Sequence, residues 1–249
     1  MNNTIYGFIL TTLAGLSTLL GTIIIFINKK KNNKIIIGSL SFAAGVMLTV
    51  SLTDLIPESI NLLNKTFIIF PAIIIMLIFI VIGIIISTAI DKYIPQRREG
   101  ELYKVGIISM LAIILHNIPE GIATFLSTEN NITLGLSLTI AIALHNIPEG
   151  ISISVPIYYA TGSKIKAFTY TLISGLSEPL GALIAYLFLK NLVNDTIMGI
   201  IMAVIAGIMI QISCYELLPT SLKYKRKKIT VLLFIIGTLF MLTNHFIFN

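Results

Sequence analysis

The sequence predicts an all-α integral membrane protein with eight transmembrane helices. Of its 249 residues, 56% are hydrophobic and only 11% are charged, and the mean hydropathy is +0.96. A helix needs roughly 20 apolar residues to cross the hydrocarbon core of a bilayer, and eight runs in the chain reach that length. Because lipid offers no partners to backbone polar groups, each run must satisfy its own backbone as a helix. We therefore expect a single membrane domain over residues 1–249.

The boundaries of the spans follow from the apolar runs. They are expected near residues 5–28, 35–58, 66–90, 104–127, 133–159, 164–189, 196–221 and 229–247. The first run does not have the pattern of a cleaved signal peptide, because Met1 to Thr4 carry no basic residue and the basic cluster follows the run. We expect it to remain as a membrane helix.

Basic residues follow alternate spans and predict the orientation of the chain. Fifteen of the seventeen lie after spans 1, 3, 5 and 7: Lys29, Lys30, Lys31, Lys34, Lys92, Arg97, Arg98, Lys104, Lys164, Lys166, Lys223, Lys225, Arg226, Lys227 and Lys228. Only Lys65 and Lys190 lie elsewhere. Loops rich in Lys and Arg stay in the cytoplasm, so we expect both termini to be extracellular. The net charge of +6 is then a topology signal and an attraction to anionic lipids, which needs no nucleic acid partner.

Small residues indicate which spans can approach closely. Spans 2, 5, 6 and 7 are rich in Gly, Ala and Ser, whereas spans 3 and 8 are mostly Ile, Leu and Phe. We expect an inner bundle of helices 2, 4, 5 and 7, joined by 1 and 6, with 3 and 8 at the periphery. Cys214 is the lone cysteine, which excludes an intrachain disulfide and a cysteine-rich metal site.

The sequence His-Asn-Ile-Pro-Glu-Gly occurs twice, inside neighbouring apolar runs. The copies are His116–Gly121 and His145–Gly150, 29 residues apart. An ionisable group in the middle of a membrane is costly, so it indicates a functional site by default. Since a short turn near Asn130 makes spans 4 and 5 an antiparallel pair, both motifs fall near mid-membrane. We expect the two copies to form one shared site.

Each copy offers ligands for a transition metal. Residues three and four apart share a face of a helix, which groups His116, Asn117 and Glu120, and likewise His145, Asn146 and Glu149. Imidazole with carboxylate suits zinc and its first-row neighbours, whereas calcium and magnesium prefer oxygen ligands. Pro119 and Pro148 each free a helical carbonyl, and Gly121 and Gly150 allow another backbone to approach.

Further acids lie inside the expected spans, with no Lys or Arg at similar depth. Glu178, followed by Pro179, lies deep in span 6 and is expected to be a third carboxylate of the same site. Asp54 and Glu58 lie one turn apart near the outer end of span 2, and Glu216 lies near the inner end of span 7. A surplus of acids needs a cation or protons, and acids at several depths indicate a path rather than a sealed site.

Each of these residues also has a structural interpretation. The two histidines could join helices through hydrogen bonds of about 1 kcal/mol, although a doubled seven-residue match, with Leu before each His, favours ligands. Glu178 could also be a packing contact, and Met47 is favoured as core filler. Asp54 and Glu58 could equally be interfacial acids, and Glu216 could equally be solvated at the cytoplasmic edge. His245, near the outer end of span 8, is expected to be interfacial and unrelated to the site.

The doubled motif, the eight spans and the outside termini resemble the ZIP (Zrt-/Irt-like) family of divalent metal transporters. The stretches Ser41–Met47 and Glu216–Pro219 also fit this family. The resemblance implies inward movement of zinc, often with iron, manganese, cobalt or cadmium, through a two-metal centre between helices 4 and 5. The implied ligands of the first metal are His116, Glu120, His145 and Glu149. The implied ligands of the second are Asn117, Asn146 and Glu178, with Glu120 and Glu149 bridging; Met47 is an additional candidate.

Two departures from the family's pattern bear on function. The loop from Asp91 to Lys104 has no His, where many relatives have a His-rich loop. Asn146 is neutral where some relatives carry a charge, which is expected to weaken the second metal position and to broaden selectivity.

The leading hypothesis is therefore a multi-pass zinc importer of the cytoplasmic (inner) membrane, with no catalytic residues. Its partners would be the lipid bilayer and divalent metal ions as substrates, with no organic cofactor; a homodimer is left open. The alternatives are a membrane-embedded metalloenzyme and a passive metal channel. The His-Glu-x-x-His of zinc proteases and the Glu-x-x-His repeat of di-iron bundles are absent from the sequence.

Overall fold

The protein is a bundle of helices. The computed structural model describes residues 3–27, 32–93, 100–189 and 194–248, and these contain no strand. Within them, eight helical segments are long and apolar enough to cross a membrane: Asn3–Ile27, Asn33–Asn64, Ile69–Tyr93, Glu101–Asn130, Ile132–Thr161, Lys164–Phe188, Asp195–Leu222 and Lys227–Ile247. The predicted fold class is confirmed.

Several of the spans are built from more than one helical element. Span 1 comprises α1 (Asn3–Ser17), a 3₁₀ turn (Thr18–Thr22) and α2 (Ile23–Ile27). Span 2 comprises α3 (Asn33–Val50), a π turn (Ser51–Leu55) and α4 (Ile56–Asn64). Spans 3 to 5 are α5 (Ile69–Tyr93), α6 (Glu101–Asn130) and α7 (Ile132–Thr161). Span 6 comprises α8 (Lys164–Gly175), α9 (Ser177–Ile184) and a π turn (Ala185–Leu189). Span 7 comprises α10 (Asp195–Gln211), a π turn (Ile212–Leu217) and α11 (Leu218–Leu222). Span 8 is α12 (Lys227–Phe248).

Two of these π turns have a cause in the sequence. The turns Ser51–Leu55 and Ile212–Leu217 end two residues before Pro57 and Pro219. Proline lacks the N–H that would close an α-helical turn on the carbonyl four residues earlier, so the helix widens there. Single π turns recur at functional sites, and these two carry the acids Asp54 and Glu216.

Starts of spans are fixed by short polar side chains. Asn131 accepts hydrogen bonds from the backbone N–H groups of Thr133 (2.9 Å) and Leu134 (3.3 Å) at the start of α7. Asn32, Ser163 and Asn194 cap α3, α8 and α10 in the same way. Each cap satisfies an N–H group that has no partner within its helix.

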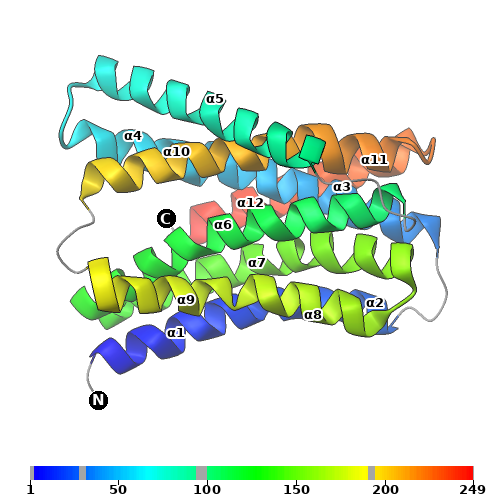
Figure 1. The fold of residues 1–249 in the computed structure, drawn as a ribbon, viewed down its shortest axis with the longest axis horizontal. Coiled ribbons are helices and arrows are strands. Elements are labelled where there is room, and N and C mark those ends of the chain that lie inside the picture. Colours follow the sequence, from blue (N-terminus) through cyan, green and yellow to red (C-terminus); the bar gives the residue numbers. More distant parts are fainter. Residues whose placement is uncertain (1–2, 28–31, 94–99, 190–193, 249) are drawn as a thin grey trace.

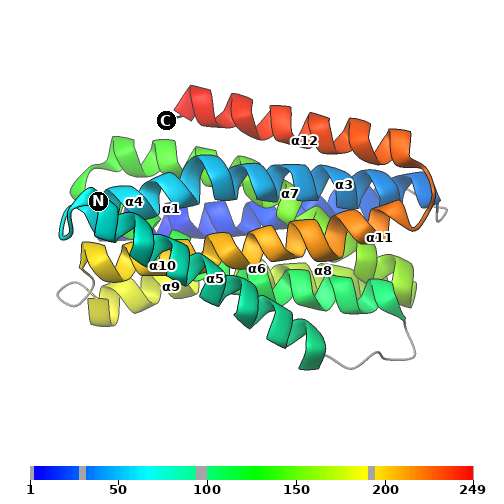
Figure 2. The same cartoon turned by 90° about the horizontal axis from the view of Figure 1, so that it is seen from above.

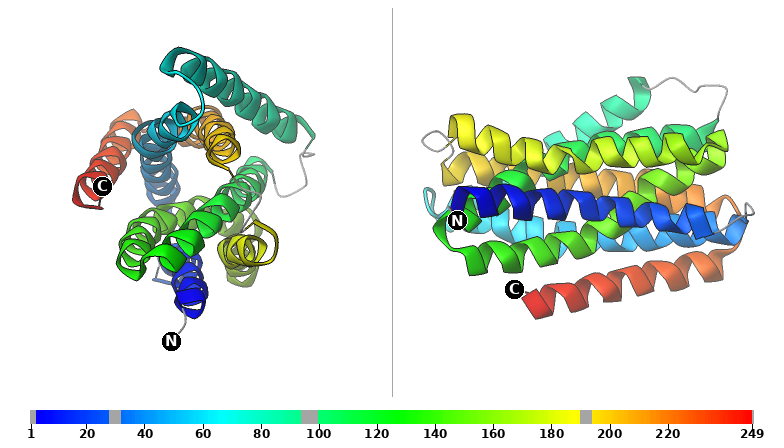
Figure 3. Two further views of the ribbon diagram at one scale, coloured as in Figure 1. Left: turned by 90° about the vertical axis from the view of Figure 1, so that its left-hand side faces the viewer. Right: turned by 90° about the horizontal axis from the view of Figure 1, so that it is seen from below.

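Burial separates two spans from the rest. In the apolar centres of α5 and α12, 17% and 22% of the residues are buried, compared with 44% to 78% in the other six described spans. Seen from the end of the bundle, α5 and α12 lie at its edge (Figure 3, left). This agrees with the expected periphery of spans 3 and 8.

The described spans form two groups of four, which are separated when seen from the end of the bundle (Figure 3, left) and overlap when seen from above (Figure 2). Spans 1, 4, 5 and 6 form one, the motif group; spans 2, 3, 7 and 8 form the other, the wall group. Glycines join helices inside each group: a Cβ at Gly121 would overlap the Glu178 carbonyl, and a Cβ at Gly207 would overlap the Ile80 carbonyl. Wherever a glycine of the described residues meets another helix this closely, that helix belongs to the same group. Each group is therefore tightly packed within itself.

The two ends of the bundle differ. Both termini and the α4–α5 and α6–α7 turns lie at one end, the terminal end (Figure 1, left). The opposite end, the basic end, carries the described basic residues after spans 1, 3, 5 and 7. Of the residues used to predict orientation, Lys29, Lys30, Lys31, Arg97, Arg98 and Lys190 lie outside the described residues. That the terminal end faces outward stays a prediction.

Polar contacts connect the two groups at the basic end. Lys104 of α6 lies 2.7 Å from the Asp91 carboxylate of α5, and Lys223 after α11 pairs with Glu101 of α6. The Tyr159 hydroxyl of α7 accepts a hydrogen bond (2.9 Å) from the backbone N–H of Asn32. The groups are thus held together where the chain is most basic.

The glycine contacts yield a stability prediction. Gly207→Ala is expected to lower stability by about 1–3 kcal/mol, because its Cβ would press on the rigid backbone of α5. Gly38→Ala is the matched control, since its Cβ would meet only the end of the flexible Leu233 side chain. Thermal unfolding in detergent, followed by fluorescence-detected size-exclusion chromatography, measures both. Equal melting temperatures for the two variants would contradict the prediction.

Candidate metal centre

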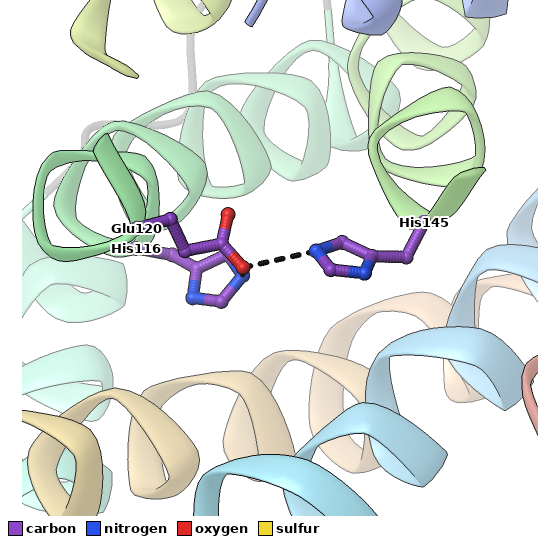
Figure 4. Close-up of side chains that lie close together, drawn as sticks. All are labelled: His116, Glu120 and His145. Carbon is purple, nitrogen blue, oxygen red and sulfur yellow. Dashed lines mark hydrogen bonds and ion pairs between the residues drawn. The ribbon is translucent and has the colours of Figure 1, made fainter. Parts of the chain in front are cut away.

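The two copies of the motif meet between α6 and α7, as predicted. Oε1 of Glu120 lies 3.1 Å from Nε2 of His116 and 2.9 Å from Nε2 of His145 (Figure 4). Nε2 of His116 also lies 3.5 Å from Oε1 of Glu149. One ligand atom from each of His116, Glu120 and His145 can be chosen so that all three lie within 4.8 Å of one another. Residues from two antiparallel helices thus form one cluster.

These separations suit a small transition ion. Zinc binds nitrogen and oxygen at about 2.0–2.2 Å in a tetrahedron, which places neighbouring ligand atoms roughly 3.4 Å apart. The observed distances of 2.9, 3.1 and 3.5 Å fall on both sides of that value. Two imidazoles and two carboxylates can therefore surround one ion after small side-chain movements.

Close backbone packing holds the cluster in place. Gly121, next to Glu120, lies against the Glu178 carbonyl of α9, and Gly150, next to Glu149, lies against the Thr18 carbonyl of span 1. Gly181 likewise lies against the Ile118 carbonyl. Any side chain at these glycines would separate the helices and the ligands they carry. The Gly of the repeated motif thus positions its Glu.

The two asparagines and Glu178 form a second polar group beside the cluster. The Asn146 amide donates hydrogen bonds to the Glu178 carboxylate and to the Ala14 carbonyl (3.0 Å). The Asn117 amide donates to the Ser174 carbonyl (3.4 Å). Both amide oxygens and Oε2 of Glu178 are buried without a hydrogen-bond partner among the described residues. This group therefore offers oxygen ligands.

Unsatisfied polar atoms are concentrated at this place. Nine buried side-chain atoms without a hydrogen-bond partner among the described residues are Nδ1 and Nε2 of His116, Oδ1 of Asn117, Oε2 of Glu120, Nδ1 of His145, Oδ1 of Asn146, Oε1 and Oε2 of Glu149, and Oε2 of Glu178. Buried polar atoms normally have partners, and leaving one without costs about 1–3 kcal/mol. No Lys or Arg is among the buried residues that the structure describes. A bound cation would satisfy these atoms and balance the carboxylates.

A cavity of about 740 Å³ connects the cluster with the terminal end. Lys65, Asn130 and Asp195 line it near that end, and Glu120 and His145 line it at depth. Further lining residues are the acids Asp54 and Glu58, the amides Asn61 and Asn244, and the thioethers Met198, Met202 and Met241. A hydrated ion can therefore reach the cluster from this side.

The remaining candidate residues lie apart from the cluster. Met47 is fully buried in the apolar core, and its role as an additional ligand stays a prediction. Glu216 lies in the π turn near the basic end, and Asp54 and Glu58 line the cavity nearer the terminal end. His245 was expected to be interfacial and unrelated to the site, but its Nδ1 lies 2.5 Å from Oδ1 of Asp54, and both residues line the cavity.

His245 is the residue that sequence reasoning missed. The signal available in the sequence was the polar pair Asn244–His245 near the end of an otherwise apolar span. Its importance depends on which helix lies beside it. Because spans 2 and 8 are far apart in the chain, the sequence alone did not supply that neighbour.

Comparisons with known proteins agree with this geometry. A family model described as ZIP Zinc transporter matches residues 98–245. The chain is 41% identical to Zinc transporter ZupT of Clostridium perfringens (strain 13 / Type A), covering 100% of this chain and 98% of the relative. It is 40% identical to the Streptococcus mutans protein of that name, covering 97% of each, and 42% identical to that of Oceanobacillus iheyensis, covering 90% and 91%. The chain therefore belongs to the ZIP zinc transporter family, a family of transporters rather than enzymes.

Proposed function

We propose that this protein imports zinc across the cytoplasmic membrane through the cluster of His116, Glu120, His145 and Glu149. The observation that carries the proposal is a dense set of buried, unpartnered ligand atoms at the floor of a cavity. The relatives named as zinc transporters over nearly their whole length support zinc as the substrate. The predicted orientation, with the terminal end outside, makes the movement inward.

The donor set favours transition ions over the more abundant magnesium and calcium. An ion that enters the cluster exchanges water for two imidazole nitrogens and carboxylate oxygens, which suits zinc and its neighbours. The same donors accept iron(II), manganese(II), cobalt(II) and cadmium(II), so we include these as further substrates. Chloride or phosphate would meet the carboxylates of Glu120 and Glu149 in this cluster and is disfavoured by charge.

A second metal position beside the first deepens the proposal. Asn117, Asn146 and Glu178 supply its oxygen ligands, and Glu120 and Glu149 bridge the two ions. Asn146 and Glu178 are already hydrogen-bonded to each other across α7 and α9. Because Asn146 carries no charge, this position is expected to hold its ion more weakly than the first.

Release to the cytoplasm requires a second arrangement of the bundle. The proposed ligands all belong to the motif group, whereas Asp54, Glu58 and Met202, which line the opposite side of the cavity, belong to the wall group. A shift of one group against the other would close the cavity and open the basic end without separating the ligands. This is the behaviour of a carrier, and it distinguishes the proposal from a passive channel. A homodimer, left open by the sequence, stays a prediction.

Neutralising Glu120 tests the cluster. Glu120→Gln and His145→Ala are each expected to abolish zinc accumulation at unchanged protein level, because Glu120 contacts both imidazoles. Uptake of radioactive zinc into cells and into sealed vesicles containing the purified protein measures this. Glu129→Gln, on the same helix but hydrogen-bonded to Thr4 near the terminal end, is the matched control and should retain uptake. Normal uptake in Glu120→Gln and His145→Ala would refute the assignment.

Asn146→Asp tests the second position. The aspartate would lose two hydrogen bonds donated by the amide and face Glu178 as a like charge, so the metal-free variant should melt lower than the wild type. Zinc should then raise its melting temperature more than that of the wild type, since ligand binding stabilises the folded state. Asn117→Asp provides the comparison on the other helix. Identical zinc-induced shifts in Asn146→Asp and the wild type would argue against a metal position at this residue.

Chemical labelling tests the cavity and the orientation. Ser127 lines the cavity. In a Cys214→Ser background, the variant Ser127→Cys should therefore react with a membrane-impermeant maleimide added to intact cells. Lys223→Cys, at the basic end, should react only after the membrane is permeabilised. Zinc should slow the reaction at residue 127 by favouring closed states. The reverse labelling pattern would show that the predicted orientation is wrong.

A further inference from the structure

Asp54 and His245 form a carboxylate–imidazole pair above the cluster. Oδ1 of Asp54, in the π turn of span 2, lies 2.5 Å from Nδ1 of His245 on α12. Both side chains are about one-quarter exposed, at 24% and 27%. They are 191 residues apart in the chain, so tertiary structure alone brings them together.

The pair lies on the route by which an ion would reach the cluster. Asp54 and His245 line the cavity whose other lining residues include Glu120 and His145. Glu58 and Asn61, one and two turns beyond Asp54 on the same span, line it as well. Of the three histidines in the chain, His145 and His245 line this cavity.

We propose that His245 and Asp54 form an outer metal site, which takes a divalent transition ion before the ion reaches His116, Glu120 and His145. The inference rests on the proposed function, since it assumes that metal passes through this cavity. It adds a binding site in a part of the bundle remote from the doubled motif.

The geometry of the pair prepares the imidazole to bind metal. When a carboxylate accepts the Nδ1–H of a histidine, the lone pair lies on Nε2, and protein carboxylates orient metal-binding histidines in this way. Nε2 of His245 would therefore be the nitrogen ligand and Asp54 its positioning carboxylate. Water and the oxygens of Glu58 or Asn61 would complete the coordination.

A site of this kind suits capture rather than storage. A single imidazole in an open cavity leaves most coordination positions to water, so the ion binds weakly and leaves quickly. An ion that passes through several sites in turn must bind weakly enough at each one to leave it for the next. The imidazole also prefers transition ions to magnesium and calcium, so selection would begin before the ion is dehydrated.

The competing interpretation is that the pair joins spans 2 and 8 without binding metal. α12 is among the least buried spans, and a hydrogen bond to Asp54 would help to hold it against α3. His245→Gln separates the two roles, because glutamine can donate a hydrogen bond to Asp54 but supplies no imidazole nitrogen. The experiment therefore needs a direct observation of His245.

Nitrogen NMR of histidine provides this observation. We would label the full-length, untagged protein with ¹⁵N-histidine in lipid nanodiscs and use the variant His116→Ala/His145→Ala, in which His245 is the sole imidazole. Zinc is expected to shift the Nε2 resonance of His245, whereas magnesium at the same concentration leaves it in place. Adding Asp54→Asn should raise the zinc concentration needed about tenfold, the lower limit of what such outer partners contribute. Asp195→Asn, which removes a charge from the same cavity, should leave that concentration within about twofold, because a charge at this exposed position contributes little.

The outcomes separate this inference from the proposed function. An Nε2 resonance that does not move in saturating zinc overturns the outer site, even if Glu120→Gln abolishes uptake as expected. Uptake by His245→Gln in the otherwise wild-type protein provides a second test: the outer site predicts a KM raised about tenfold with kcat retained. Wild-type KM in that variant, with the protein folded, also overturns the inference. Wild-type zinc uptake by Glu120→Gln would refute the proposed function, but it would not by itself change what the Nε2 resonance of His245 shows about the outer site.

Discussion

The burial of several carboxylates without a buried Lys or Arg is the constraint on which this structure depends. Glu120, Glu149 and Glu178 lie inside the bundle, and no buried Lys or Arg accompanies them among the described residues. Charges removed from water are stable only when they are paired or neutralised. The chain keeps them at one place by packing glycines against the backbones of neighbouring helices. A rigid scaffold thus maintains a set of ligands that is incomplete without a cation or protons.

The division into two groups connects this constraint with movement. All seven candidate ligands in the membrane interior belong to the motif group, within which the helices meet backbone to backbone. The wall group supplies the opposite side of the cavity and the pair of Asp54 and His245. Relative displacement of two rigid groups changes the shape of the cavity and leaves distances inside the motif group unchanged. At the basic end the ion pair of Lys223 and Glu101 is exposed, whereas that of Lys104 and Asp91 is partly buried. Exposed pairs contribute little stability, so the pair of Lys223 and Glu101 can be broken at low cost.

The spans and the cluster of the doubled motif could be predicted from the sequence for physical reasons. Spans follow from the length of apolar runs, and the cluster follows from a repeat on antiparallel neighbours, because both are local properties of the chain. The π turns also have a local cause in Pro57 and Pro219. The direction in which the Asp54 side chain points, however, is known only from the three-dimensional structure. The contact between Asp54 and His245, and the role of Gly207, depend on which distant helices are neighbours. Periodicity and composition carry no information about such pairings.

The repeated motif does not produce a symmetric site, and the asymmetry has a direction. Glu120 contacts both imidazoles and lines the cavity together with His145, whereas His116 and Glu149 lie deeper, each with 1% of its surface exposed. Spans 1 and 6 also surround the two copies differently: Asn146 donates to the Ala14 carbonyl and to Glu178, while Asn117 donates to the Ser174 carbonyl. In the proposed function, an ion arriving through the cavity would meet Glu120 and His145 first and would become fully dehydrated only at Glu149 and Glu178. Each copy thus contributes one ligand to the outer half and one to the inner half of the cluster, because α6 and α7 run in opposite directions.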